Sequence, residues 1–574
     1  MMKNLYIKTF LFFCFLCFVG CEEYLDQPPQ DQLTDETYWT NEGNAKTFAF
    51  GFYTPYFRGY GSGFTWGNYF SGQSLNDDFA PTNPPQFQQQ VPASGGGWSF
   101  FYVRKANIFI NRVQTVPMEQ EAIDHWTGIG RFFRGMEYHD LVNRFGDVPY
   151  YEQELGEDDS ELLYKERDDR SFVMDKVLED FQFAAGNVRS SVDNPGQEVN
   201  RDVVLAFMSR IFLFEGTWQK YHEGNSTKAA EYLEASKWAA EQIINSGNYS
   251  LGNYRSVFNS LDLGGNPEVI LFREYAVGQL THSLNSYVNK ESQTGASNDA
   301  IQTYLSSDGL PIEISTSYQG DKGIENVMAN RDPRMYGTFV EDSLRIRGTV
   351  SNFSTTGFSV LKFLNEDIMD SPEGVSNQNP TDAPIIRYGE VLINYAEAAA
   401  ELATVCGPSL SQQDIDKSIN VLRDRPGVEL PHLEVSGTAV SVNGTTYDDP
   451  NRDPSVSSIL WEIRRERRIE LMMEGFRLDD LRRWKKLEYT DMLSNTDINR
   501  GAWIVKSEVQ ARYPDSDLSS LTLTEGEQGY LIPAAAAESA RTFDNPRVYL
   551  SPIPLDQIKL YSDQGVELTQ NPGW

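Results

Sequence analysis

ILWEIRRERRIELMMEGFRLDDLRRW, residues 459–484, is dense in charge and still has the spacing of a helix that buries one side. Glu462 and Arg465 are three residues apart, as are Arg467 and Glu470, so opposite charges lie side by side on the helix surface and attract. Gly475 stands where a helix end needs a left-handed residue, and the spacing of the leucines after it predicts a second short helix. The side chains available for burial are Leu460, Ile463, Leu471, Met472, Met473 and Phe476.

A charge-rich run of this kind is typical of a solvent-exposed helix, and it also raises the possibility of nucleic-acid binding. The composition argues against the second interpretation. The chain of 574 residues carries 49 Lys+Arg against 82 Asp+Glu, a formal net charge of −33. Such a charge repels a phosphate backbone, so we expect no nucleic-acid partner.

Several other stretches accompany this run in a fixed order. They are CEEYLDQPPQD from Cys21, GRFFRGMEYHDLVNRFGDVPY (130–150), LAFMSRIFLF (205–214), SSDGLPI (306–312), NRDPRM (330–335), IIRYGEVLINYAEAA (385–399), SINVLRDRPGV (418–428), and the closing LSPIPLDQIKLY and TQNPGW. Together with residues 459–484 they closely resemble the SusD/RagB family, the lipid-anchored glycan-binding proteins of the Bacteroidetes outer membrane. The resemblance covers nearly the whole chain.

The resemblance implies a mainly α fold, in which a scaffold of tetratricopeptide-type helical repeats packs against an irregular, loop-rich half with short strands. Residues 41–574 would then form a single bilobed domain. In it, we expect the charged residues from Arg464 to Glu470, with Arg477, to tie the two halves together through paired, hydrogen-bonded charges rather than to contact a ligand. It also implies a surface lipoprotein without catalytic residues or cofactor, which captures an oligosaccharide or polysaccharide and delivers it to a SusC-like TonB-dependent outer-membrane transporter. Two alternatives stay open: capture of peptides, as in RagB-like variants, and a glycoside hydrolase.

The N-terminus has the pattern of a lipoprotein signal. Lys3 and Lys8 precede an apolar run over residues 10–19, and small Gly20 comes before Cys21. This pattern predicts a signal peptide over residues 1–20, too short to span a bilayer as a helix. Cys21 would carry the lipid, and residues 21–40 would form the anchor and tether of a protein on the outer membrane, facing the cell exterior. Ordinary secretion, with Cys21 incidental, is the alternative.

Helical periodicity follows Trp98 along much of the chain. Residues 202–218 and 227–246 have the length of a tetratricopeptide-type helix pair, with small alanines where the helices would pack closely. Residues 247–381, rich in Gly, Ser, Asn and Asp, predict long loops with short strands instead. The other helices are expected at 41–57, 101–113, 119–144, 171–188, 388–402 and 412–423.

Residues 61–98 combine aromatic rings with planar polar groups, the combination that a sugar-binding site needs. We expect Trp66, Tyr69 and Trp98 to offer flat faces to sugar C–H groups, and Asp77 and Asp78 to bind the hydroxyl rim. Core packing is the alternative for each of the three rings. The sequence has neither an HExxH nor a GxSxG motif, so we assign neither catalytic nor metal-binding residues.

Overall fold

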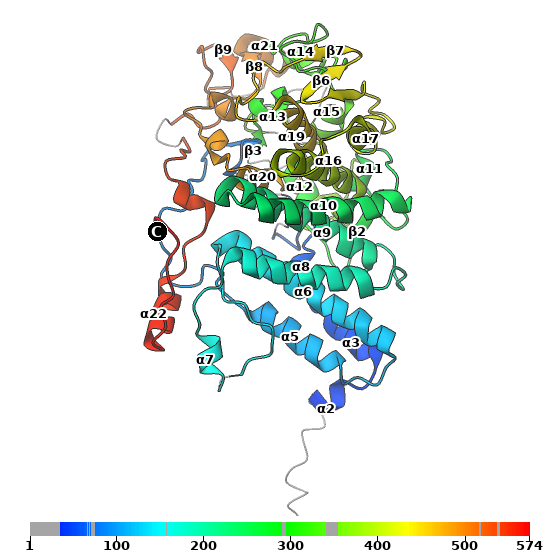
Figure 1. The fold of residues 1–574 in the computed structure, drawn as a ribbon. Coiled ribbons are helices and arrows are strands. Elements are labelled where there is room, and N and C mark those ends of the chain that lie inside the picture. Colours follow the sequence, from blue (N-terminus) through cyan, green and yellow to red (C-terminus); the bar gives the residue numbers. More distant parts are fainter. Residues whose placement is uncertain are drawn as a thin grey trace, which may run out of the picture.

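Long helices stacked side by side form one half of the molecule in this computed structural model, which describes residues 35–574 except 66, 68, 70–74, 157, 290–293, 340–353, 516–517, 520 and 537–539 (Figure 1). Each helix of the stack packs against the next one along the chain. From first to last, the stack consists of α5 (Phe101–Val113), α6 (Gln120–Phe145), α8 (Arg170–Asn187), α9 (Arg201–Trp218), α10 (Ser226–Ser246), α16 (Tyr388–Val405) and α19 (Ser458–Glu470).

The α9–α10 pair confirms the predicted helix-turn-helix, and its ends follow from side-chain caps. The side-chain oxygen of Asn200 accepts the backbone N–H of Val203 at 3.0 Å, which satisfies a free donor at the start of α9. Asn225 caps α10 in the same way. The helices approach closely at Gly216, where a Cβ would lie 2.6 Å from the Leu233 side chain. Any larger residue there would force the pair apart.

Two segments predicted as single helices are broken in the structure. The N–H of Gly51 bonds to the carbonyl of Phe48, and this turn closes the first helix. The Ser418 hydroxyl donates to the Asp414 carbonyl at 2.5 Å, and this side-chain bond takes an acceptor that a continuous helix would use. In place of 41–57 and 412–423 the chain forms α3 (Glu42–Phe50), α4 (Tyr53–Tyr56), α17 (Gln412–Asp416) and α18 (Ile419–Arg423).

The other half consists of loops and small antiparallel sheets, as predicted for residues 247–381, together with short helices that were not predicted. Its strands pair as β1 (Phe79–Pro81) with β3 (Thr294–Ala296), β2 (Val269–Arg273) with β4 (Ala383–Arg387), β5 (Leu433–Ser436) with β6 (Ala439–Val442) and β7 (Thr445–Tyr447), and β8 (Trp503–Val505) with β9 (Gln528–Tyr530). The short helices are α11 (Ser256–Asn259), α12 (Leu284–Asn289), α13 (Asn298–Gln302), α14 (Ile324–Met328), α15 (Pro333–Thr338) and α21 (Lys506–Arg512). The remaining helices are α2 (Asp35–Tyr38), α7 (Ser160–Leu163), α20 (Arg477–Arg483) and α22 (Leu555–Asp563).

Helix α19 joins two hydrophobic cores. Leu460 and Ile463 belong to the core of the helical half, whereas Ile469 and Met472 belong to the core of the loop-rich half. The helix ends at Glu470, before the predicted Gly475, because both Met473 and Gly475 have positive φ angles, 68° and 91°. The predicted second short helix is present as α20.

Buried ion pairs tie these cores together, as predicted for the charged run. Glu470 is fully buried and accepts hydrogen bonds from Arg425 at 2.6 Å, Arg387 at 2.7 Å and Arg334 at 3.2 Å. Burial alone would raise the pKa of Glu470, but the three guanidinium groups lower it to about 2. The carboxylate therefore stays charged in the folded protein at neutral pH.

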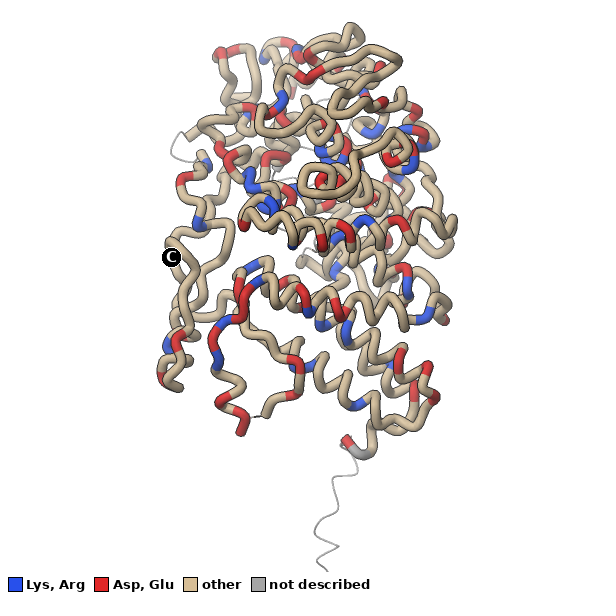
Figure 2. Tube along the Cα trace, viewed as in Figure 1, with Lys and Arg blue, Asp and Glu red and all other residues tan. Residues whose placement is uncertain are grey.

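The two predicted pairs along the helix surface have different outcomes. Arg465 donates to Glu462 at 3.1 Å, which confirms the first. The prediction of an Arg467–Glu470 pair was wrong. Arg467 forms an ion pair with Asp480 of α20 at 2.8 Å instead, because tertiary partners compete with the neighbouring turn of the helix. Over the molecule as a whole, acidic and basic residues are intermingled in both halves (Figure 2).

Candidate functional site

Two of the predicted aromatic platforms lie inside the protein. The Tyr69 hydroxyl donates to the carbonyl of Pro384, and its ring packs edge-on against Tyr60. Trp98 packs edge-on against Phe145, with 5.0 Å between ring centroids. Each of the two residues is 7% exposed, as core packing would require, and a ligand role for them stays a prediction. Trp66 and Cys21 lie outside the described residues.

The predicted acidic pair is also buried, and arginines of the charged run hold it. Arg477 donates to Asp77 at 2.6 Å, and Arg468 donates to Asp78 at 2.8 Å. Burial raises the pKa of Asp77, but Arg468 and Arg477 outweigh this effect and lower the pKa to about 2. Asp77 thus stays ionised, and it reaches the wall of a cavity that Tyr69 and Trp98 do not touch.

This cavity, which we call the Trp461 cavity, has a volume of about 490 Å³, within the range of small-molecule sites. Three aromatic side chains line it: Trp461, Trp484 and Tyr489. Apart from Pro454, its remaining walls are polar and charged, formed by Asp77, Asp299, Gln302, Thr303, Glu313, Asp449, Asn451, Arg452, Asp453, Arg464, Arg465, Arg468, Arg477, Glu488, Ser494 and Asn495.

Hydrogen bonds fix the aromatic rings of the cavity before any ligand arrives. The Trp461 indole N–H donates to Asp449 at 2.9 Å, and the Tyr489 hydroxyl donates to Asp453 at 2.5 Å. The Trp484 indole N–H donates to Glu397 at 2.7 Å. Rings held in place lose little conformational entropy on binding, so the cavity is preorganised.

The cationic groups of the cavity are largely neutralised by carboxylates. Arg468 donates to Asp299 at 2.6 Å as well as to Asp78, and Arg464 donates to Glu401 at 3.0 Å while its guanidinium lies 4.4 Å from the Trp484 ring centre. In contrast, the Gln302 side-chain amide makes no hydrogen bond to the described part of the chain. The cavity therefore offers polar groups to a neutral ligand without a large excess of one charge.

The three aromatic residues were not predicted from the sequence, because the charged run was interpreted as structural only. A signal was present in the spacing. Trp461, Arg464, Arg465 and Arg468 recur at intervals of three, one and three residues, so they lie on one face of α19. All four line the cavity, and Trp461 also packs against the core of the helical half. An aromatic ring among the arginines of this face was the signal that the face also lines a cavity.

Two findings concern metal and membrane features in the part of the chain that the structure describes. Within the described residues, no group of three or more His, Cys, Asp and Glu side chains is arranged to hold a metal ion. Among the described helices, none is long and apolar enough to cross a bilayer.

Comparison with known proteins identifies the family. The model of the SusD family matches residues 267–574, and a model described as "Starch-binding associating with outer membrane" matches residues 50–213. SusD-like protein P38 of Formosa agariphila is 23% identical over 84% of this chain and 92% of its own length. SusD-like protein P25 of the same organism is 24% identical over 87% and 94%.

Solved structures share the fold. A SusD-like carbohydrate-binding protein from Bacteroides fragilis superposes with a TM-score of 0.67 at 20% identity, over 92% of this chain and 99% of that one. A laminarin-binding SusD-like protein gives a TM-score of 0.53 at 18% identity, over 93% and 100%. These neighbours confirm the mainly α fold. Since the SusD family model matches more than half of the sequence, the chain belongs to the SusD family.

Proposed function

We propose that this protein binds an oligosaccharide or polysaccharide at the cell surface and that the Trp461 cavity holds part of it. The observation that carries the glycan assignment is the pair of family matches, one of them to a family described as starch-binding and associated with the outer membrane. The names of two structural neighbours, a carbohydrate-binding and a laminarin-binding protein, point the same way.

The chemistry of the Trp461 cavity suits a sugar. A pyranose ring has apolar C–H faces and a rim of hydroxyl groups, so it binds where flat aromatic faces adjoin fixed donors and acceptors. Trp461 is part-exposed and supplies such a face, while Gln302 and Asn451 supply amide groups beside it. Arginines of the cavity wall are already paired with carboxylates, so the ligand need not carry a negative charge to neutralise them.

The finer parts of the proposal concern the membrane and the partner. A lipid on Cys21, after removal of residues 1–20, would hold the protein on the outer membrane facing outward, with residues 21–40 as anchor and tether. Residues 41–574 would act as one domain. A captured glycan must still cross the membrane, so we propose that the protein delivers it to a SusC-like TonB-dependent transporter and leaves it chemically intact.

Calorimetry on the soluble chain from residue 22 onward tests the proposal, with a panel of neutral and acidic glycans and of short peptides as ligands. Trp461→Ala should weaken binding of the cognate glycan by about 2 kcal/mol or more, roughly 30-fold, because buried aromatic anchors carry most of the binding energy. Trp238→Ala is the matched control, since Trp238 is 41% exposed on α10, away from the cavity.

Three outcomes would change the proposal. Loss of affinity in Trp66→Ala with full affinity in Trp461→Ala would move the site to residues 61–98, where the sequence analysis expected it. Binding of peptides and of none of the glycans would favour the RagB-like alternative. Release of shortened glycan that depends on one carboxylate would favour a glycoside hydrolase.

A further inference from the structure

One buried arginine of the Trp461 cavity, Arg464 of α19, has hydrogen-bond donors without acceptors. Its side chain is 7% exposed. The Nη2 group donates to the Tyr221 hydroxyl at 2.8 Å and to Glu401 at 3.0 Å. Nε is enclosed and makes no hydrogen bond, and Nη1 bonds to none of the described residues although it is not enclosed. Because Arg464 lines the cavity, the free Nη1 group opens onto it.

The neighbouring arginines of the cavity wall are bonded more completely. Three of them use all three side-chain nitrogens: Arg452, Arg465 and Arg468. Arg477 donates to Asp77 from two nitrogens and keeps Nη1 free. On this wall, Arg464 is thus the arginine with two nitrogens that bond to none of the described residues. Buried polar groups in native proteins nearly always have a partner, so an acceptor from outside the chain would complete the bonding of Arg464.

The protein holds the Arg464 side chain in one orientation. Glu401 of α16 is fully buried and also accepts from Lys220, so it anchors one end of the guanidinium group. The guanidinium carbon lies 4.4 Å from the centre of the Trp484 ring. Trp461 stands three residues earlier on α19, so the side chains of Trp461 and Arg464 are neighbours on the helix surface. A fixed donor therefore adjoins the aromatic face proposed for the sugar.

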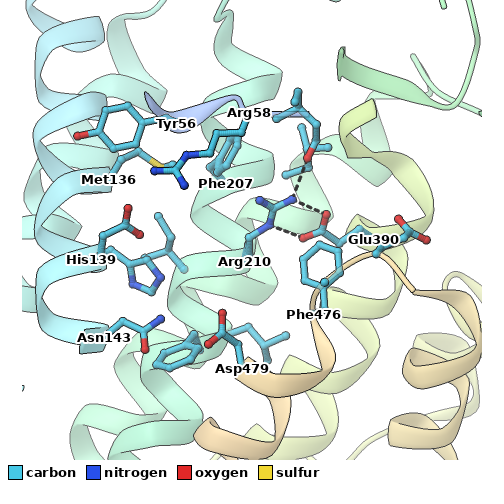
Figure 3. Close-up of a pocket in the computed structure, with 18 of the residues that line it drawn as sticks. Tyr56, Arg58, Met136, His139, Asn143, Phe207, Arg210, Glu390, Phe476 and Asp479 are labelled. Atoms are coloured by element: carbon cyan, nitrogen blue, oxygen red, sulfur yellow. Dashed lines mark hydrogen bonds and ion pairs between the residues drawn. The ribbon is translucent and has the colours of Figure 1, made fainter. Parts of the chain in front are cut away.

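A second cavity, of about 390 Å³, lies where α6, α9 and α20 meet and provides a contrast (Figure 3). Its Arg210 donates to both oxygens of Glu390, at 2.6 and 2.7 Å. Arg58 and Asp140 form no ion pair within the described part of the chain, but both residues are exposed, so water bonds to them. Charged groups that water reaches give no reason to expect a ligand, whereas Arg464 is largely withdrawn from water.

We propose that Arg464 is a ligand-binding residue, which donates a hydrogen bond from Nη1 to a hydroxyl oxygen of the sugar that stacks on Trp461. This inference rests on the proposed function and names the group of the glycan that the cavity recognises. It gives Arg464 a role beyond the tie between the two halves that was expected for the charged run. A sugar without this hydroxyl leaves the donor unbonded, so the cavity should discriminate against it.

Calorimetry on the soluble chain from residue 22 onward tests this role, with laminarihexaose, cellohexaose, maltohexaose, xylohexaose, mannohexaose and an alginate hexamer as probes. Arg464→Lys keeps a cation beside Glu401 but removes Nη1. Whichever probe wild type binds, this variant should bind it at least about tenfold more weakly, because a hydrogen bond from a charged donor is lost.

Arg134→Lys is the matched control. Arg134 is also buried, on α6, and its three nitrogens all bond within the protein, to Asp180, Asn107 and the Glu152 carbonyl. This control should lose stability and keep full affinity. Arg464→Met is a second test variant, since it keeps an apolar side chain against Trp484 and leaves Glu401 bonded to Lys220. It should lose as much affinity as Arg464→Lys does.

Monodeoxy analogues of the probe that binds separate direct contact from a structural role. One analogue should bind wild type more weakly than the parent glycan does, and this difference should shrink in Arg464→Lys, because the hydroxyl and the guanidinium group are then a coupled pair. A purely structural role would lower the affinity for every analogue equally.

The outcomes distinguish this inference from the proposed function. Full affinity in Arg464→Lys, an equal loss in Arg134→Lys, or analogues that lose the same affinity in wild type and in Arg464→Lys would overturn the inference. If Trp461→Ala loses affinity while Arg464→Lys keeps it, the inference fails and the proposed function stands. Binding of none of the probes by wild type would count against both.

Discussion

Replacing Glu470 with glutamine should destabilise the fold strongly, because it removes one negative charge from the centre of three buried arginines. Arg334, Arg387 and Arg425 are each at most 2% exposed and donate to this carboxylate at 2.6–3.2 Å. The amide keeps the shape but leaves the guanidinium charges undercompensated. Breaking a buried ion pair of this kind costs about 3–5 kcal/mol.

The free energy of unfolding in urea, followed by tryptophan fluorescence and by circular dichroism, measures this effect. Glu231→Gln is the matched control, since Glu231 pairs with Lys228 at the surface of α10 and such pairs contribute about 0–1 kcal/mol. A Glu470→Gln midpoint equal to that of the control would refute the reasoning, because it would mean that the arginines are neutralised by other groups.

The pH dependence gives an independent check on the same charge. The folded-state pKa of Glu470 is about 2, below the unfolded value of about 4.3. Its stabilisation is therefore complete above pH ~4.3 and is lost as the pH falls toward 2. Wild type should lose stability over this window more steeply than Glu470→Gln does. Parallel acid-unfolding curves for the two proteins would contradict the assignment.

The remaining predictions concern the membrane, the partner and the chemistry. In cells fed a labelled fatty acid, wild type should become labelled and Cys21→Ala should not, because Cys21 is the thiol at the predicted signal boundary; equal labelling of the two proteins would contradict the lipid anchor. The acylated protein, extracted in mild detergent with glycan present, should bring down a barrel protein of the TonB-dependent class through an interface of roughly 2,000 Å² or more; recovery of the protein alone would argue against delivery. Purified protein incubated with its glycan should return the glycan unchanged by chromatography, and product that disappears when one carboxylate is substituted would show catalysis.

The long helices were predictable because their signals are local. Helical periodicity with asparagine caps places α9 and α10 within one residue of the expected bounds. The break between α17 and α18 was not predictable, since it depends on a Ser418 hydroxyl that bonds to the turn before it rather than to water. Likewise, Arg467 had an equally good partner in its own helix, and only the tertiary position of Asp480 decides between the two.

The candidate site was harder to predict than the fold because burial is a tertiary property. An aromatic residue next to Asn and Asp has the same local sequence whether its ring faces solvent or, like Tyr69, points into the core. Asp77 was predicted to bind the hydroxyl rim of a sugar, which stays a prediction. It reaches a cavity wall, but its partners are 391 and 400 positions away, at Arg468 and Arg477. The sequence contains these residues, but the fold alone brings them together.

Helix α19 contributes to stability and also lines the candidate site, and this limits how the site can change. One face of the helix enters both cores, and arginines of the other face line the Trp461 cavity while bonded to buried carboxylates such as Asp78. Altering these arginines to suit a new ligand would uncover buried charge, at a cost similar to that of Glu470→Gln. Residues 451–454 and 494–495 line the same cavity from loops, where substitutions disturb less of the core. Exchanging these two loops between SusD-family proteins should therefore alter glycan preference while the fold persists, and unchanged preference after the exchange would place selectivity on the helix itself.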